Sequence, residues 1–203
     1  MKLYYSPGAC SLSPHIALLE AGLPYDLVKV DVRAKKLENG DDYLTINPKG
    51  QVPALQLDNG ELVTEGPVIV QMIADKAGNG LAPARDSAER YKLLEWLNFV
   101  GTELHKNFSP LFQPVIPDDV KTFFRDRLMA KFKYLDGALA GRDHLMGKQF
   151  TVADGYLFTM LGWADRMKLD LSAMPNLLAY KARVAARPKV QEALSKEGLL
   201  KAA

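Results

Sequence analysis

Cysteine is almost absent from this chain of 203 residues, in which Cys10 is the only one. A lone cysteine excludes an intramolecular disulfide and a cysteine-rich zinc site, so the apolar core must stabilise the fold. Hydrophobic residues make up 48% of the chain, and a chain of this length can bury a sufficient core. Because a disulfide framework is missing, we expect the protein in the cytoplasm.

Long apolar runs and a strong net charge are also missing. No run of about 18 apolar residues is available to span a bilayer, and 26 basic against 24 acidic side chains leave a net charge of +2. We therefore expect neither a membrane nor a nucleic acid as a partner. The stretch before Ser6-Pro7-Gly8-Ala9-Cys10 is too short for the apolar region of a signal peptide, so we expect no secretory leader.

The first 80 residues alternate between patterns typical of strands and patterns typical of helices. Asp58-Asn59-Gly60 between two apolar runs is a strong hairpin signal. The predicted elements are a strand at 2–5, a helix at 12–21, a strand at 25–32, a helical turn at 42–47, hairpin strands at 52–57 and 62–64, and a helix that Pro67 opens. This order, β-α-β-α-β-β-α, predicts a mixed sheet and not a doubly wound parallel one.

After residue 80 the sequence shows helical patterns and no strand pattern. The predicted helices run through 86–105, 120–139, 152–166, 175–187 and 189–199. Asp86-Ser87-Ala88-Glu89 and Thr151-Val152-Ala153-Asp154 have the form of capping boxes, which open helices. We predict an α+β chain with one domain at 1–80, a linker at 78–86 and an all-helical domain at 87–203.

The net charge differs between these two regions in the same sense, because residues 1–80 carry −3 and residues 81–203 carry +5. The difference is small, but it supports two units of separate composition.

Cys10 lies between the first strand and the first helix, where exposed N–H groups and the helix dipole favour an anion. We therefore expect the pKa of its thiol to be lowered. The alternative is a buried, inert cysteine, but the polar loop Ser6-Pro7-Gly8-Ala9 favours a site. Without a second cysteine, thiol–disulfide chemistry would need an external thiol such as glutathione.

Two Pro-containing motifs flank the predicted hairpin. A cis Val52-Pro53 bond would turn the Val52 backbone toward a ligand, although most X–Pro bonds are trans and the residues alone favour an edge strand. At Glu65-Gly66-Pro67 the first turn of a helix could hold a carboxylate and Glu65 an ammonium. A plain helix cap is the simpler interpretation of this second motif.

Asn98, Thr102 and His105 follow helical spacing and share one face of their predicted helix. This polar stripe could close over a site, and it could equally be a solvated face with a cation at the helix C-terminus. His15 and His144 have no partner at metal-ligand spacing, so we expect no metal.

Taken in order, five motifs resemble those of the glutathione transferases, in particular the bacterial beta class, and they run over essentially the whole chain. They are Lys2-Leu3-Tyr4-Tyr5-Ser6-Pro7-Gly8-Ala9-Cys10-Ser11, Gly50-Gln51-Val52-Pro53, Glu65-Gly66-Pro67, Asn98 with Glu103-Leu104-His105-Lys106, and Thr151-Val152-Ala153-Asp154. The resemblance implies a thioredoxin-like N-terminal domain, an all-α C-terminal domain and a homodimer. It also implies a cis Val52-Pro53 bond, against the preference from the residues alone.

The resemblance further implies a glutathione site. Val52, next to Pro53, would pair with the cysteinyl backbone, Glu65 and Gly66 would hold the γ-glutamyl end, and Lys35 would bind the glycine carboxylate. The positions around the sulfur would be Cys10, Asn98, Thr102, Glu103, Leu104 and His105. Glu103 is also a candidate to reach the ligand of the other subunit.

The activity implied by the resemblance is transfer of the glutathione thiolate to small hydrophobic electrophiles, a detoxification reaction with glutathione as co-substrate and no cofactor. Three side chains of the first loop could meet the sulfur, namely Tyr5, Cys10 and Ser11. We choose Cys10, with His105 as the second catalytic residue. An apolar electrophile pocket is expected from Phe108, Phe112 and Trp163.

Two other functions stay open for such a chain: glutathione-dependent reduction of disulfides through Cys10, and binding of ligands or proteins without catalysis. The sequence also departs from the family in two places. Gly66 stands where most relatives have Ser, which removes a hydroxyl contact and predicts weaker glutathione binding. Gly155 leaves Phe150 without its apolar partner in the hydrophobic staple, which concerns local stability.

Overall fold

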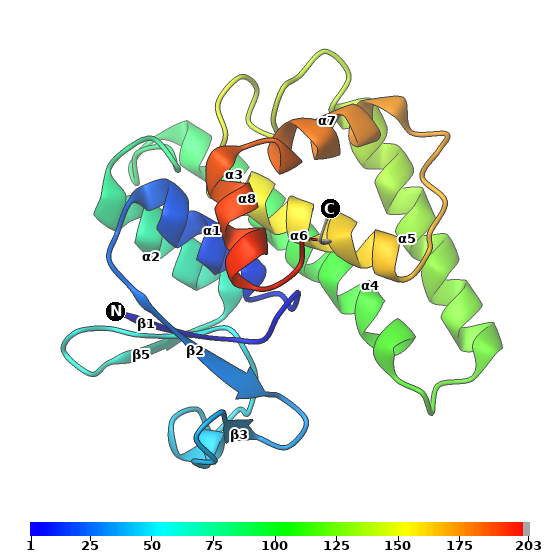
Figure 1. Cartoon of the computed structure of the whole chain (residues 1–203). Coiled ribbons are helices and arrows are strands. Elements are labelled where there is room, and N and C mark those ends of the chain that lie inside the picture. The colour runs from blue at the N-terminus through cyan, green and yellow to red at the C-terminus, as the bar shows by residue number, and fades with distance from the viewer. Residues whose placement is uncertain (201–203) are drawn as a thin grey trace. The chain divides into compact units, whose positions relative to one another are not determined.

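The computed structural model describes residues 1–200, and Figure 1 shows the path of the chain. The chain forms two compact units, of which the first comprises Met1–Ala82 and the chain from Arg187 on, and the second Pro83–Ala186. Each unit is described by itself below. The predicted helical domain reaches to residue 203, so its last three residues lie outside the described part.

The first unit contains a five-stranded mixed sheet with the strand order β3-β2-β1-β4-β5. Its strands are β1 (Lys2–Tyr5), β2 (Asp26–Asp31), β3 (Lys36–Leu37), β4 (Ala54–Gln56) and β5 (Leu62–Thr64). β1 pairs in parallel with β2, and the other neighbours pair antiparallel. The mixed sheet is therefore confirmed, as is the hairpin that joins β4 to β5.

One strand of this sheet escapes the sequence pattern. β3 has two residues, and it pairs with Val30 and Asp31 of β2. A strand this short has no alternation of apolar and polar residues to recognise. The helical turn predicted nearby is present as the short 3-10 helix η1 (Tyr43–Thr45), capped by the Asp42 carboxylate, which accepts from Leu44 N.

Three helices accompany the sheet: α1 (Leu12–Ala21), α2 (Gly66–Ala77) and α8 (Pro188–Lys196). α1 contacts both of the others, and its residues from Leu12 to Leu19 are all buried. Gly22 and Gly78 end α1 and α2 in the left-handed region at φ +65° and φ +60°, where glycine carries no steric cost. The prediction for α1 is thus correct to the residue.

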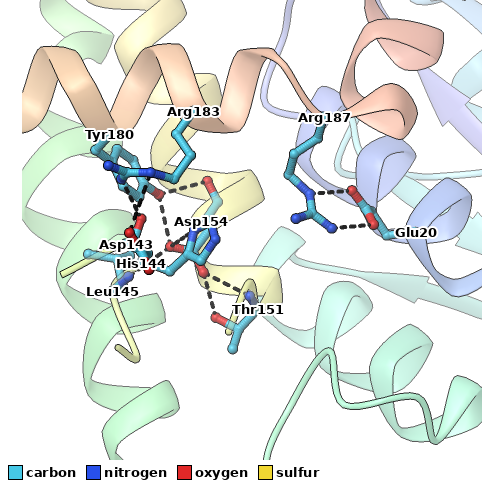
Figure 2. Close-up of polar contacts among 9 residues, drawn as sticks. All are labelled: Glu20, Asp143, His144, Leu145, Thr151, Asp154, Tyr180, Arg183 and Arg187. Carbon is cyan, nitrogen blue, oxygen red and sulfur yellow. Dashed lines mark hydrogen bonds and ion pairs between the residues drawn. The ribbon is translucent and has the colours of Figure 1, made fainter. Parts of the chain in front are cut away.

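The last helix, α8, belongs to the first unit by its contacts, whereas the sequence assigned it to the helical domain. Arg187, just before α8, forms two hydrogen bonds to the Glu20 carboxylate at the end of α1, at 2.7 and 2.8 Å (Figure 2). Val190 and Ala193 are fully buried. The apolar face of α8 was visible in the sequence, but a periodic pattern does not say which helix will cover it.

The second unit is helical apart from one isolated antiparallel β-bridge between His144 and Gly147. It contains α3 (Ala88–Phe99), η2 (Val100–His105), α4 (Lys106–Phe108), η3 (Ser109–Phe112), α5 (Asp118–Ala138), α6 (Val152–Arg166) and α7 (Pro175–Ala185). α6 is its central helix, since it is buried along nearly its whole length and contacts α3, α7 and η2. The predicted all-helical second region is confirmed.

The capping box at Thr151 is confirmed, and its carboxylate does more than cap one helix. Asp154 accepts from Thr151 N at 2.8 Å, from Leu145 N at 2.9 Å and from the Tyr180 hydroxyl at 3.0 Å, as Figure 2 shows. Burial raises the pKa of Asp154 and that of Tyr180. One buried side chain therefore joins a loop, α6 and α7.

The other predicted capping box is only half present. Ser87 is the N-cap of α3, and its hydroxyl accepts from Arg90 N at 3.2 Å. The third helical position is consequently Arg90 and not Glu89, so no carboxylate stands where the reciprocal bond would form. Near the other box, the ring of Phe150 lies against His144, with 5.7 Å between centroids, in place of an apolar staple partner at Gly155.

Among residues 1–200, none of the helices combines the length and the apolar character that a membrane crossing requires.

Candidate functional site

Cys10 lies where the sequence places it, in the turn between β1 and α1 and one residue before the N-cap Ser11. Its side chain is half-buried, and its thiol donates to the Val52 carbonyl oxygen at 3.2 Å. The cysteine and the Val52-Pro53 turn, which are far apart in the sequence, are thus in direct contact.

The two other candidates in this loop, Ser11 and Tyr5, are buried and contact other parts of the first unit. Ser11 is fully buried; its hydroxyl donates to the Ser6 carbonyl and accepts from Ser6 N, both at 3.2 Å. Tyr5 is buried, its ring lies 6.3 Å from that of His15, and burial raises its pKa. Of the three side chains weighed for contact with a sulfur, Cys10 is the one that is partly exposed.

The Val52-Pro53 bond is cis, as the family resemblance implied. Two buried side chains fix the backbone just before it, because the Tyr43 hydroxyl and the Asn47 amide both donate to the Gln51 carbonyl at 2.8 Å. The sequence reasoning missed both residues. Tyr43 and Asn47 lie in or near the short helix η1, which carries no recognisable motif. Only their contact in space with Gln51 shows that they hold the backbone before the cis proline.

Glu65 and Gly66 begin α2 beside the same turn. Glu65, the N-cap, has φ +67°, a conformation that residues with a Cβ rarely adopt outside constrained sites. Its carboxylate is 2.8 Å from the Lys49 ammonium. A Cβ on Gly66 would lie 3.8 Å from Pro53 Cγ, an ordinary contact. The helix N-terminus and the cis proline are therefore neighbours, with room for a larger residue at position 66.

Lys35 lies against the other side of the turn. Its ammonium donates to the Gly50 carbonyl at 2.7 Å, and its backbone has φ +58°. A Cβ on Gly50 would approach Lys35 Cδ to 3.1 Å and Leu44 Cδ2 to 3.0 Å at a φ of +60°, so both the backbone conformation and the packing favour glycine here. The structure thus gathers six predicted residues of the first unit around residues 50–53: Cys10, Lys35, Val52, Pro53, Glu65 and Gly66.

In the second unit, the predicted residues lie on a stretch of helix that is wider than expected. The sequence predicted a regular helix through His105, but residues Val100–His105 form a π-helix. Asn107, which is buried, donates its amide to the Glu103 carbonyl at 2.7 Å and to the Thr102 carbonyl at 3.4 Å. Such local insertions of a side chain are a known cause of irregular helix turns.

His105 is half-buried on this wide turn and is held by aromatic neighbours. Its Nδ1 lies 2.6 Å from the Tyr156 hydroxyl, and its ring stands edge-on to Trp163 with 4.9 Å between centroids. Where Tyr156 donates this hydrogen bond, the imidazole carries its own proton on Nε2. Tyr156 is a residue that sequence reasoning missed, because nothing in its spacing points to His105.

The other predicted residues of this stretch differ in what they can offer. Thr102 is exposed and donates to the Asn98 carbonyl at 3.0 Å. Glu103 is 2.9 Å from the Lys131 ammonium, whose hydrogen bond lowers the pKa of the Glu103 carboxyl. Leu104 is fully buried, so its backbone and not its side chain is available to a ligand.

The three aromatic residues of the expected pocket meet in the second unit. Trp163 stands edge-on to Phe108 and Phe112, with centroid distances of 5.7 and 5.0 Å. Phe108 has no exposed surface, whereas Phe112 is half-buried and carries the Arg166 guanidinium 5.6 Å above its ring. Phe108 therefore belongs to the core, and Phe112 is the accessible member of the cluster.

Comparison with known proteins adds the family. The model of the glutathione S-transferase N-terminal domain matches residues 8–76, and that of the glutathione S-transferase C-terminal domain matches residues 103–197. Glutathione S-transferase GstA of Escherichia coli O157:H7 is 52% identical over 201 residues, which are 98% of this chain and all of the relative.

Solved structures agree. A sphingomonad glutathione S-transferase complexed with glutathione is 51% identical with a TM-score of 0.95. The bacterial beta class glutathione S-transferase of Sphingomonas chungbukensis is 50% identical, also with a TM-score of 0.95. Each likeness covers 98% of this chain and 100% of the other. The chain therefore belongs to the glutathione S-transferase family and, within it, to the bacterial beta class.

Proposed function

We propose that the protein conjugates the thiolate of glutathione to small hydrophobic electrophiles. The observation that carries this proposal is the contact between the Cys10 thiol and the Val52 carbonyl at 3.2 Å. It supports a site in which the backbone of residue 52 holds the middle of a tripeptide, so that the sulfur of its cysteine reaches the helix N-terminus at Cys10.

The two ends of the tripeptide carry charged groups, an ammonium and a carboxylate at the γ-glutamyl end and a carboxylate at the glycine end. The first unit offers a partner for each of them. The Glu65 carboxylate suits the α-ammonium of the γ-glutamyl residue. The N–H groups of the first turn of α2, at Gly66, suit its carboxylate. The Lys35 ammonium, now on the Gly50 carbonyl at 2.7 Å, would bind the glycine carboxylate. An extended peptide placed along Val52 completes the arrangement by strand addition.

From the second unit we assign Asn98, Thr102, Glu103, the Leu104 backbone and His105 to the surroundings of the sulfur. His105 would stabilise the thiolate as a hydrogen-bond donor or a cation, because the thiolate and not the thiol is the nucleophile. Phe112 and Trp163 would receive the apolar part of the electrophile.

The reaction with chlorodinitrobenzene shows which bonds form and which break. The glutathione thiol loses its proton, the thiolate sulfur forms a bond to the carbon that bears chlorine, and chloride leaves with the electron pair of the broken bond. No oxidant or reductant takes part, and glutathione is the co-substrate. We assign this chemistry to the cytoplasm, where lone thiols stay reduced.

Cys10 suggests a side reaction with glutathione disulfide. Its thiolate would attack one sulfur of the disulfide, form a mixed disulfide with Cys10 and release one glutathione thiolate. The named relatives favour conjugation as the main activity and not disulfide reduction or binding without catalysis.

A homodimer is the assembly we propose, and exposed aromatic side chains of the second unit support it. Tyr134 of α5 is 56% exposed and lies 6.4 Å from the ring of Trp96 of α3, and exposed clusters of aromatic side chains mark interaction surfaces. Tyr134 also contacts Phe99 of α3, with 5.4 Å between ring centroids. In such a dimer Glu103 is the candidate to reach the glutathione of the other subunit.

The test of the proposed function is the rate of glutathione conjugation to chlorodinitrobenzene for the wild type and Cys10→Ala. We expect the wild type to be active. Cys10→Ala should lose the glutathione adduct that mass mapping finds after incubation with glutathione disulfide, while conjugation persists on backbone donors and His105. A wild type without conjugation would overturn the proposal, and a wild type without the adduct would remove Cys10 from contact with the sulfur.

A further inference from the structure

The end of α8 places a buried carboxylate against the loop that carries Cys10. Glu197, the C-cap of α8, has no exposed side-chain surface. Its Oε2 accepts from Gly8 N at 2.9 Å, and its Oε1 lies 2.8 Å from His15 Nδ1. Gly8 is two residues before the cysteine, so a residue from the far end of the chain holds the turn that presents the thiol.

The partners of this carboxylate are themselves fixed. His15 is fully buried in α1, and its Nε2 lies 2.9 Å from the Tyr25 hydroxyl. Tyr25 in turn lies under the Lys196 ammonium, 5.5 Å from the centre of its ring. Glu197 can therefore accept from two rigid donors at once, which gives it one geometry.

The packing around Gly8 supports the same conclusion. Gly8 has φ +68°, and a Cβ placed on it would lie 3.4 Å from Leu199 Cδ2. The backbone of Gly8 is thus covered by Leu199 and bonded to Glu197. The start of the turn is closed separately, because Ala9 N donates to the Ser6 carbonyl at 3.0 Å and Ser11 bonds Ser6.

We infer that Glu197 is a positioning residue for Cys10: its carboxylate, supplied by the C-terminal end of the chain, fixes the turn at Gly8 and so holds the Cys10 thiol on the Val52 carbonyl. The length of the Glu197 side chain is essential, because each carboxylate oxygen has a separate partner and both bonds are needed. A shorter acid would keep the charge and lose one of the two bonds.

Two variants separate reach from charge. Glu197→Asp keeps the charge but is one methylene shorter, so it cannot serve both Gly8 and His15. Glu197→Gln keeps the length and an oxygen for Gly8 N–H. Its NH₂ can donate to His15 Nδ1 once the imidazole carries its proton on Nε2, where the Tyr25 hydroxyl accepts it. Arg187→Gln is the matched control, because Arg187 fastens the other end of α8 to Glu20.

The readout is the rate at which iodoacetamide alkylates the folded chain between pH 6 and 9. Cys10 is the only cysteine, so every modified thiol reports on this loop. We expect alkylation of Glu197→Asp at pH 7 to be about fivefold faster than that of the wild type, the factor that corresponds to one ordinary hydrogen bond. The pH at which alkylation reaches half of its maximal rate should also fall, because the Val52 carbonyl binds only the protonated thiol and the variant loses this contact. Glu197→Gln and Arg187→Gln should stay within about twofold.

Three results would overturn the inference: an unchanged Glu197→Asp, a Glu197→Gln that changes as much as Glu197→Asp, or an equal change in Arg187→Gln. Near-ultraviolet circular dichroism checks that each variant is folded. If Glu197→Asp does not fold, the wild type supplies the test: in dilute urea, the opening of Gly8 N–H measured by hydrogen exchange and the exposure of Cys10 measured by alkylation should have the same free energy, and different free energies would refute the clamp.

The importance of the clamp for turnover rests on the proposed function, but its test uses no glutathione. A clear difference between Glu197→Asp and Glu197→Gln in a protein without conjugation activity would refute the proposed function alone. Active conjugation with identical alkylation rates would refute the clamp alone.

Discussion

The two units present their candidate residues in different ways. In the first unit the backbone conformation sets the position of the groups: the Val52 carbonyl and the first turn of α2 are backbone groups, and Lys35, Gly50 and Glu65 all have positive φ. In the second unit they come from side chains on a wide helical turn, above all His105 with its partner Tyr156. The first arrangement depends on where the chain turns, and the second on which side chain stands at each position.

This difference predicts how each half responds to substitution. A change in the first unit should act when it alters backbone conformation, even where it removes no functional group. A change in the second unit should act when it removes a polar atom, even where the backbone stays in place. Three substitutions test the two statements, from the largest expected effect to the smallest.

Gly50→Ala should have the largest effect. The new methyl would meet Leu44 at 3.0 Å and Lys35 at 3.1 Å at a φ of +60°, so strain and crowding add. We expect about 2–3 kcal/mol of lost stability and a KM for glutathione raised about tenfold, since a displaced binding turn loses its contacts together. Thermal unfolding and steady-state kinetics measure both quantities.

The control for this substitution is Gly60→Ala. Gly60 has φ +86°, but a Cβ there would meet nothing within 4 Å, so it carries the strain of positive φ without the crowding. We expect a loss of stability of about 1 kcal/mol and an unchanged KM for glutathione. Equal effects of the two variants on KM would refute the importance of the 50–53 turn.

Tyr156→Phe tests the statement about the second unit. It removes one oxygen, 2.6 Å from His105 Nδ1, and leaves the ring that packs in the unit. Loss of this bond frees the imidazole to change its tautomer and orientation, so we expect kcat for conjugation to fall about fivefold to tenfold with little change in the KM for glutathione. A fall in affinity without a fall in kcat would assign Tyr156 to binding instead.

A double-mutant cycle makes this prediction specific. In a His105→Ala background the Tyr156 hydroxyl has no imidazole to orient, so Tyr156→Phe should then have no further effect on kcat. His105→Ala alone should lower kcat more than it weakens glutathione binding. Additive effects of the two substitutions would show that Tyr156 does not act through His105.

The comparison of the two units also separates what the sequence could predict from what it could not. Apart from β3, the order of elements follows from periodicity and local chemistry, which act between neighbours along the chain, and so do the mixed sheet, α1 and the Thr151 capping box. The clustering around residues 50–53 could be expected only from the family resemblance. No rule of spacing links Cys10 to Val52.

The misses have physical reasons as well. The π-helix at Val100–His105 is accompanied by bonds from the Asn107 amide to carbonyls earlier in the chain, and helical periodicity carries no trace of such bonds. The placement of α8 in the first unit depends on Glu20 and Glu197, whose partners are more than 160 positions away. Tertiary contacts of this kind decide the site's geometry without leaving a local pattern.

The smallest expected effect belongs to Gly66, where the first unit should accept a new side chain. A Cβ there would lie 3.8 Å from Pro53 Cγ, so Ser fits without moving the turn, and its hydroxyl adds the contact that the family resemblance implies. A hydrogen bond to a charged group contributes at most about 1.5–3 kcal/mol, and water competes for it at this surface. We therefore expect Gly66→Ser to lower the Kd for glutathione about threefold to fivefold in calorimetry.

Gly66→Ala is the matched control for this last prediction, because it adds the same carbon without the oxygen. If Gly66→Ala binds glutathione as the wild type does and Gly66→Ser binds it more tightly, the backbone has kept its conformation and the hydroxyl alone has acted. If both variants bind more weakly, the backbone at the start of α2 tolerates no Cβ once the ligand is present. The first unit would then rely on the close approach of its backbone to glutathione. The contrast with the second unit, which relies on side chains, would be larger than the present distances indicate.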